Sequence, residues 1–190
     1  MGNPSVVVVD DNPALLEKLR SLLSSKFEVV ATAADGRSAL DVIRRYRPEL
    51  VILDLGIPAP NGFEVAKELT KDSQSPSVVI CSAENDPEVV ESALRAGAIA
   101  YVFKKRIGED LILALESVLQ GKAFVSIALK FALPTVVLLE ILLQQIAFFW
   151  LKKVVSVVNG DLTTPVEKQR ISIENLKARG IWRPPDFPLA

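Results

Sequence analysis

The feature that most constrains this chain is a repeated alternation, across residues 5–121, of short apolar runs with helix-length amphipathic segments. The runs are residues 5–9, 28–33, 50–53, 77–81 and 100–103. Short, β-branched runs without a polar face are typical of parallel strands buried on both sides. The alternation therefore predicts an α/β domain in which five parallel strands form one sheet with helices on both faces.

Local signals support the helices between these runs. Asn12 and Asp86 each directly precede a proline, which puts a capping side chain before a proline at the first helical position. Gly97 and Gly121 are expected to follow helix ends, because glycine readily adopts the left-handed conformation found there.

Composition excludes several classes of protein. The net charge of −1 and pI of about 5.6 indicate no electrostatic footprint for nucleic acid. Cys81 is the only cysteine and there is no histidine, so an intrachain disulfide and the usual zinc ligand sets are ruled out. The N-terminus has neither a basic n-region nor a cleavage site, so we expect no signal peptide and a cytoplasmic location.

Polar residues follow the apolar runs at the points where the strands should end. In a doubly wound sheet, ligands bind beyond the carboxyl ends of the strands. The residues at these ends are Asp10 and Asp11, Asp54, Ser82, and Lys104. Their conjunction predicts one site built on a rigid sheet.

The chemistry of these residues indicates metal-assisted phosphoryl transfer. Three converging carboxylates would repel one another unless a divalent cation neutralised them, and hard oxygen ligands suit Mg²⁺. With the metal bound, Asp54 could act as a nucleophile that becomes an aspartyl phosphate. Lys104 would then supply a positive charge, and Ser82 a hydroxyl donor, for the phosphoryl oxygens.

The sequence resembles the receiver domain of two-component response regulators over residues 5–121. The stretches that carry the resemblance are VVVVDDNP, PELVILDLGIPAPNG, VVICSAEND and RAGAIAYVFKK. The resemblance implies a flavodoxin-like, doubly wound sheet of strand order 2-1-3-4-5, which we assign to residues 1–122. It also implies a partner, a sensor histidine kinase or phosphotransfer protein, in phosphorelay signal transduction.

The same resemblance implies roles for individual residues. Asp54 would be phosphorylated, with Ser82 and Lys104 completing the catalytic set. The metal ligands would be Asp10 through water, Asp11 directly, Asp54, and the carbonyl of Gly56. Ser82 and Tyr101 would form the switch pair. Such a protein is not a metabolic enzyme, since its chemistry is Mg²⁺-dependent self-phosphorylation and self-dephosphorylation. The alternatives are a constitutive pseudo-receiver interaction module and a small flavodoxin-like enzyme.

Past Gly121 the pattern changes. The resemblance is strongest to the subgroup whose receiver precedes a helix-turn-helix domain, but no basic recognition helix follows, so we predict no DNA-binding domain. Residues 123–158 are predicted to be an apolar helical extension, and residues 159–190 a polar, proline-containing tail. Residues 131–151 could span a membrane, pack on a partner, membrane surface or second copy, or be the product of a frameshift or fusion.

Overall fold

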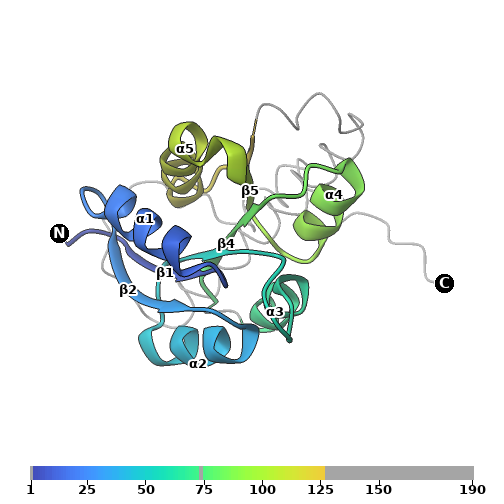
Figure 1. Cartoon of the computed structure of the whole chain (residues 1–190), viewed down its shortest axis with the longest axis horizontal. Coiled ribbons are helices and arrows are strands. Elements are labelled where there is room, and N and C mark those ends of the chain that lie inside the picture. The colour runs from blue at the N-terminus through green and yellow to red at the C-terminus, as the bar shows by residue number, and fades with distance from the viewer. Residues whose placement is uncertain (1, 73–74, 127–190) are drawn as a thin grey trace, which may run out of the picture. The chain divides into compact units, whose positions relative to one another are not determined.

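The computed structural model describes residues 2–72 and 75–126, which form a parallel sheet flanked by helices (Figure 1). Within these residues the sheet has six strands in the order β2-β1-β3-β4-β5-β6. The strands are β1 Ser5–Val9, β2 Glu28–Ala33, β3 Leu50–Leu53, β4 Ser77–Ser82, β5 Ala100–Phe103 and β6 Phe124–Val125. The predicted order 2-1-3-4-5 is confirmed, with β6 added beside β5.

The helices divide between the two faces of the sheet. They are α1 Pro13–Leu23, α2 Gly36–Tyr46, α3 Gly62–Leu69, α4 Pro87–Arg95 and α5 Ile107–Leu119, with a 3₁₀ turn, η1 Lys104–Arg106, between β5 and α5. Helices α2, α3 and α4 pack on one face, and α1 and α5 pack on the other. Successive strand residues point to opposite faces, so each central strand contributes to both cores.

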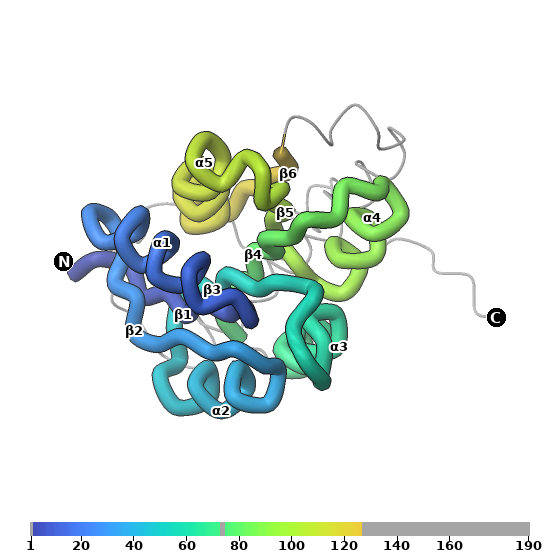
Figure 2. The backbone as a smooth tube through the Cα atoms, in the orientation of Figure 1, coloured from blue at the N-terminus to red at the C-terminus, as the bar shows by residue number. Residues whose placement is uncertain are grey.

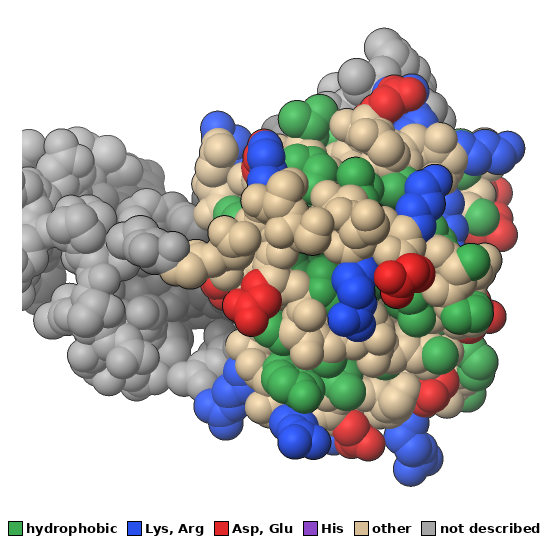
Figure 3. Space-filling view, turned by 60° about the vertical axis from the view of Figure 1, so that its left-hand side comes forward, with side chains coloured by type: hydrophobic (Ala, Val, Ile, Leu, Met, Phe, Trp, Pro, Cys, Tyr) green, Lys and Arg blue, Asp and Glu red, His purple; other side chains and the backbone are tan. Residues whose placement is uncertain are grey.

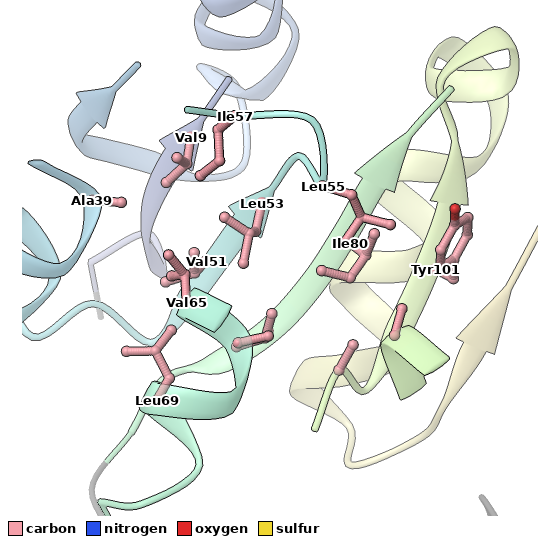
Figure 4. Close-up of a cluster of buried hydrophobic side chains, with 14 of the residues drawn as sticks. Val9, Ala39, Val51, Leu53, Leu55, Ile57, Val65, Leu69, Ile80 and Tyr101 are labelled. Atoms are coloured by element: carbon pink, nitrogen blue, oxygen red, sulfur yellow. The ribbon is translucent and has the colours of Figure 1, made fainter. Parts of the chain in front are cut away.

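Each face has its own apolar core. In β1, Val7 and Val9 join the core under α2, α3 and α4, whereas Val6 and Val8 join the core under α1 and α5. Figure 4 shows part of the first core, where Ile80 of β4 lies beside Tyr101 of β5. All four residues of β3 and all four of β5 are buried, which explains why these strands read as apolar on both sides.

The helix boundaries follow the predicted caps. The Asn12 side chain accepts hydrogen bonds from the N–H groups of Ala14 and Leu15, and the Asp86 side chain accepts one from Glu88. Gly97 and Gly121 follow the ends of α4 and α5 with positive φ angles of 107° and 73°. These helix stops are therefore confirmed, as glycine tolerates that conformation without steric cost.

Strand β6 was not predicted. It pairs in parallel with β5, with Ala100 opposite Phe124 and Tyr101 opposite Val125 (Figure 2). A strand of two residues is too short to show an alternation, so the expected five strands became six. The sheet extends past residue 122, the predicted end of the domain.

The remaining predictions for the C-terminal part of the chain concern residues outside the described ones. They include the helical extension predicted over residues 123–158 from residue 127 onward, the polar tail over residues 159–190, and the absence of a helix-turn-helix domain after Ser126. At its start the helical prediction is wrong, because Phe124–Val125 form strand β6. Among the helices formed by residues 2–72 and 75–126, none has both the length and the apolar character needed to cross a bilayer.

Candidate functional site

Three carboxylates meet at the carboxyl ends of β1 and β3. Val9 lies opposite Leu53 in the sheet register, so the residues that follow, Asp10 and Asp54, leave the sheet side by side. Asp10, Asp11 and Asp54 each place an oxygen within 4.8 Å of the others. Asp10 and Asp54 are buried, whereas Asp11 is exposed. The predicted convergence of the three carboxylates is confirmed.

Lys104 links two of these carboxylates. It is the first residue after β5, and its Nζ lies 2.7 Å from Asp10 Oδ2 and 3.0 Å from Asp54 Oδ2. Partial burial by itself would lower the pKa of Lys104, but the hydrogen bonds and negative charges of Asp10 and Asp54 outweigh it, and the pKa is raised. The ammonium group is therefore charged at neutral pH, beside Asp54.

The Asp10 carboxylate is held at both oxygens. Its Oδ1 accepts a hydrogen bond of 2.9 Å from the N–H of Asn12, and its Oδ2 contacts Lys104. Sequence reasoning treated Asn12 only as a helix cap. Its backbone contact with Asp10 comes from the same tight turn, which carries the chain from β1 directly into α1.

Ser82 and Tyr101 lie on neighbouring strands and share a network with Glu84. Ser82 ends β4 and is 2% exposed. Its Oγ accepts a hydrogen bond of 3.2 Å from the Glu84 N–H, and the Tyr101 hydroxyl donates to the Glu84 carbonyl at 2.9 Å. The Tyr101 ring is fully buried, and burial raises the pKa of its phenol to about 12. The phenol therefore stays protonated at neutral pH and can donate a hydrogen bond. The contact with Glu84 was not predicted from the sequence.

The loop after β3 keeps its backbone close to Asp54. A Cβ placed on Gly56 would lie 3.4 Å from Asp54 Oδ2, and a Cβ on Gly62 would overlap the Asp54 carbonyl. Gly62 therefore lets α3 begin directly against the end of β3. Gly56 therefore lies beside the Asp54 carboxylate, and its role as a metal ligand through its carbonyl stays a prediction.

Surface charge agrees with the composition. In the face shown in Figure 3, Lys and Arg side chains are interspersed with Asp and Glu rather than gathered by sign. That face offers no basic patch of the kind that binds a phosphate backbone.

Comparison with known proteins identifies the family. A family model described as "Response regulator receiver domain" matches residues 6–116, more than half of the chain, so the chain belongs to that family. It is similar to the nitrate/nitrite response regulator protein NarL of Escherichia coli (strain K12), with 33% identity over 127 residues that cover 66% of this chain and 59% of NarL. It is also similar to the transcriptional regulatory protein DegU of Brevibacillus brevis, with 30% identity over 122 residues that cover 63% of this chain and 52% of DegU.

Solved structures agree with these relatives. The fold is similar to a LuxR-family two-component response regulator from Aurantimonas sp. SI85-9A1, with a TM-score of 0.64, 28% identity and coverage of 67% and 93% of the two chains. It is also similar to the signal receiver domain of the putative response regulator NarL from Mycobacterium tuberculosis, with a TM-score of 0.62, 29% identity and coverage of 64% and 100%. The flavodoxin-like receiver fold is confirmed.

These matches support a role in two-component phosphorelay signalling, and response regulators as a class are not metabolic enzymes. The chain spans between 52% and 62% of the length of the curated relatives named DegU, NarL and EvgA. The likeness accordingly rests on the receiver.

Proposed function

We propose that Asp54 accepts a phosphoryl group, with Asp10 and Asp11 holding Mg²⁺ beside it and Lys104 and Ser82 binding the phosphoryl oxygens. The observation that carries the proposal is the contact of Lys104 Nζ with both Asp10 and Asp54 inside a three-carboxylate cluster. Such a cluster, at the strand ends of a receiver fold, brings together a nucleophile, a metal-ligand set and a cation.

In this reaction one Asp54 oxygen attacks the phosphorus of the donor. The bond between phosphorus and the donor's leaving group breaks, the leaving group takes the electron pair, and Asp54 becomes an aspartyl phosphate. The Lys104 ammonium can move from the carboxylate oxygen to a phosphoryl oxygen, because both carry negative charge. Ser82 ends β4 at the same edge of the sheet and supplies a hydroxyl donor from its own strand end.

The donor set fits Mg²⁺. Its members are carboxylate oxygens within 4.8 Å of one another, one of them on the exposed Asp11, with the backbone of Gly56 nearby. Mg²⁺ prefers few carboxylates and retains several waters. When bound, it would neutralise negative charge on the carboxylates and on the phosphoryl group.

The donor would be a sensor histidine kinase or a phosphotransfer protein. Acceptance of the phosphoryl group would bias the switch pair Ser82 and Tyr101. The network of Ser82, Glu84 and Tyr101 supports that role, because a change at the Ser82 hydroxyl reaches the Tyr101 hydroxyl through a single residue. Because the reaction modifies the protein itself, it is self-phosphorylation rather than turnover of a metabolite.

The test is incubation of the full-length chain with acetyl phosphate and Mg²⁺, followed by intact mass. We expect one phosphoryl adduct that hydroxylamine removes, as an acyl phosphate requires. Asp54→Asn should abolish it, and the control Asp41→Asn, an exposed aspartate on α2, should retain it. An adduct that persists in Asp54→Asn would refute the assignment of the nucleophile.

A further inference from the structure

Ser126 is a buried polar residue outside the carboxylate site. The buried polar residues of the described chain are Asp10, Asp54, Ser82, Asp110 and Ser126. The first three belong to the site, and Asp110 pairs with Arg106 at 3.0 Å. Ser126 is 0% exposed and takes no part in the proposed reaction. A fully buried hydroxyl needs a hydrogen-bond partner, and its partners show what it does.

Both polar contacts described for Ser126 are to the backbone of β5. Its N–H donates to the Tyr101 carbonyl at 3.0 Å, and its Oγ accepts from the Phe103 N–H at 3.1 Å. β6 ends at Val125, and the register of the pair would bring the backbone carbonyl of Ser126 itself opposite the Phe103 N–H. The Ser126 side chain accepts this hydrogen bond in place of that carbonyl, so the hydrogen bonds along the edge of β5 continue to Phe103.

The anchored residue, Phe103, lies directly before Lys104. On its other edge Phe103 is opposite Ser82 in the pairing of β4 with β5. The end of β5 is therefore held from both sides, by its pairing with the end of β4 and by the Ser126 side chain. Lys104 is the next residue, so the backbone position of Phe103 sets the position of the Lys104 Cα. The side chain extends from there to Asp10 and Asp54.

We infer that Ser126 is a positioning residue for phosphoryl transfer: through its bond to Phe103 it fixes the backbone from which Lys104 reaches the acceptor carboxylate. This inference rests on the proposed role of Lys104. It also means that a displacement of Tyr101, or of Lys104 through Phe103, reaches residue 126 through one hydrogen bond. Residue 126 is the last of the described residues and directly precedes residues 127–190.

The test compares Ser126→Ala with Ser126→Thr in the full-length chain. Alanine removes the acceptor, so we expect phosphorylation by acetyl phosphate to slow about tenfold while the Mg²⁺ affinity stays within about twofold. A misplacement of about 1 Å can cost about 100-fold in rate, and a smaller shift of Lys104 should cost less. Threonine retains the hydroxyl and should restore the rate to within about twofold. Hydrogen exchange of a peptide spanning residues 100–106 should be faster in Ser126→Ala than in wild type, because the Phe103 N–H has lost its acceptor.

Two controls separate positioning from loss of stability. Ile43→Val in α2 removes a buried methyl group far from β5, and Ser24→Ala removes an exposed hydroxyl at the end of α1. Both should phosphorylate at the wild-type rate. A wild-type rate in Ser126→Ala, or an equal loss of rate in Ile43→Val, would overturn the inference. Failure of the proposed function would appear differently, as the absence of an Asp54 adduct in wild type. In that event unchanged exchange at residues 100–106 in Ser126→Ala would still refute the anchoring of Phe103.

Discussion

The ammonium nitrogen of Lys104 lies 3.0 Å from a carboxylate oxygen of Asp54, and the same nitrogen lies 2.7 Å from Asp10. The three residues come from the ends of three different strands. Their separation is therefore set by the hydrogen-bonding register of the sheet rather than by a flexible loop. A site of this kind is preorganised, so a substitution within it should change the rate of the reaction.

Lys104→Met tests how much this lysine contributes to the rate of phosphorylation and to stability. Loss of the cation removes charge stabilisation of the phosphoryl group, so we expect phosphorylation by acetyl phosphate to slow at least tenfold, about 1.4 kcal/mol in the barrier. Asp10 and Asp54 also lose a partner, so the free energy of unfolding should fall by about 1–3 kcal/mol in the absence of Mg²⁺. Urea unfolding measures it.

The control for this substitution is Lys105→Met, which removes the neighbouring, exposed lysine. It should change neither the rate nor the stability appreciably. A Lys104→Met variant that phosphorylates as fast as wild type would show that the contact with Asp54 has no role in the reaction.

Asp11→Ala tests the metal site. The variant loses one oxygen ligand, so we expect the affinity for Mg²⁺ to fall at least tenfold, about 1.4 kcal/mol, and phosphorylation to slow with it. The rise of the melting temperature with added Mg²⁺ reports this affinity. Without Mg²⁺, one less carboxylate in the cluster relieves repulsion, so the variant should be at least as stable as wild type.

Glu17→Ala, which removes an exposed carboxylate on α1, is the matched control for charge. It should keep the wild-type response to Mg²⁺. If Asp11→Ala bound Mg²⁺ and accepted phosphate as wild type does, the assignment of Asp11 as a ligand would be wrong.

Tyr101 predicts a pH dependence in the alkaline range. Burial raises its pKa from 10.0 to about 12, so the folded state keeps a proton that the unfolded chain releases. The contribution of Tyr101 to stability is therefore fully present below pH 10 and is lost as the pH rises toward 12. The chain has two tyrosines, so Tyr46→Phe leaves Tyr101 as the sole phenol.

In that variant, phenolate absorbance should rise with a midpoint well above 10 while circular dichroism still reports a folded chain. Adding Tyr101→Phe should abolish the absorbance change and flatten the fall of stability between pH 10 and 12. A midpoint near 10 in the folded protein would contradict the burial of the hydroxyl.

The contacts of β6 and Ser126 with β5 predict how far the C-terminal end of the receiver can be shortened. A chain ending at Gly121 loses β6, the burial of Val125 and the hydrogen bonds of Ser126. We expect it to be about 2–4 kcal/mol less stable in urea than a chain ending at Ser126. Equal stability of the two chains would show that β6 contributes nothing to the fold.

Much of this protein could be predicted from the sequence alone. The five longer strands and their order, the caps at Asn12 and Asp86, and the stops at Gly97 and Gly121 agree with the structure. The strands, caps and stops depend on local signals: the period of apolar residues, the capping side chain and the permitted backbone angles. The strand order was implied by the resemblance to receiver domains. The cluster of Asp10, Asp11 and Asp54 followed as well, because parallel strands end at a common edge.

Tertiary structure decided the features that depend on partners distant in sequence. Glu49 and Ser5 exchange hydrogen bonds across 44 residues at the amino ends of β3 and β1, a contact that no local pattern announces. Strand β6 could not be predicted from the sequence either, since two residues are too few to show a period. Ser126 contacts Phe103 only because the chain after α5 runs along the edge of β5. The sequence by itself determined which residues form the strands and which chemistry gathers at their ends, because those signals are local. Only packing decided that Lys104 contacts Asp10 as well as Asp54, and that a serine beyond the last predicted helix anchors the strand that carries that lysine.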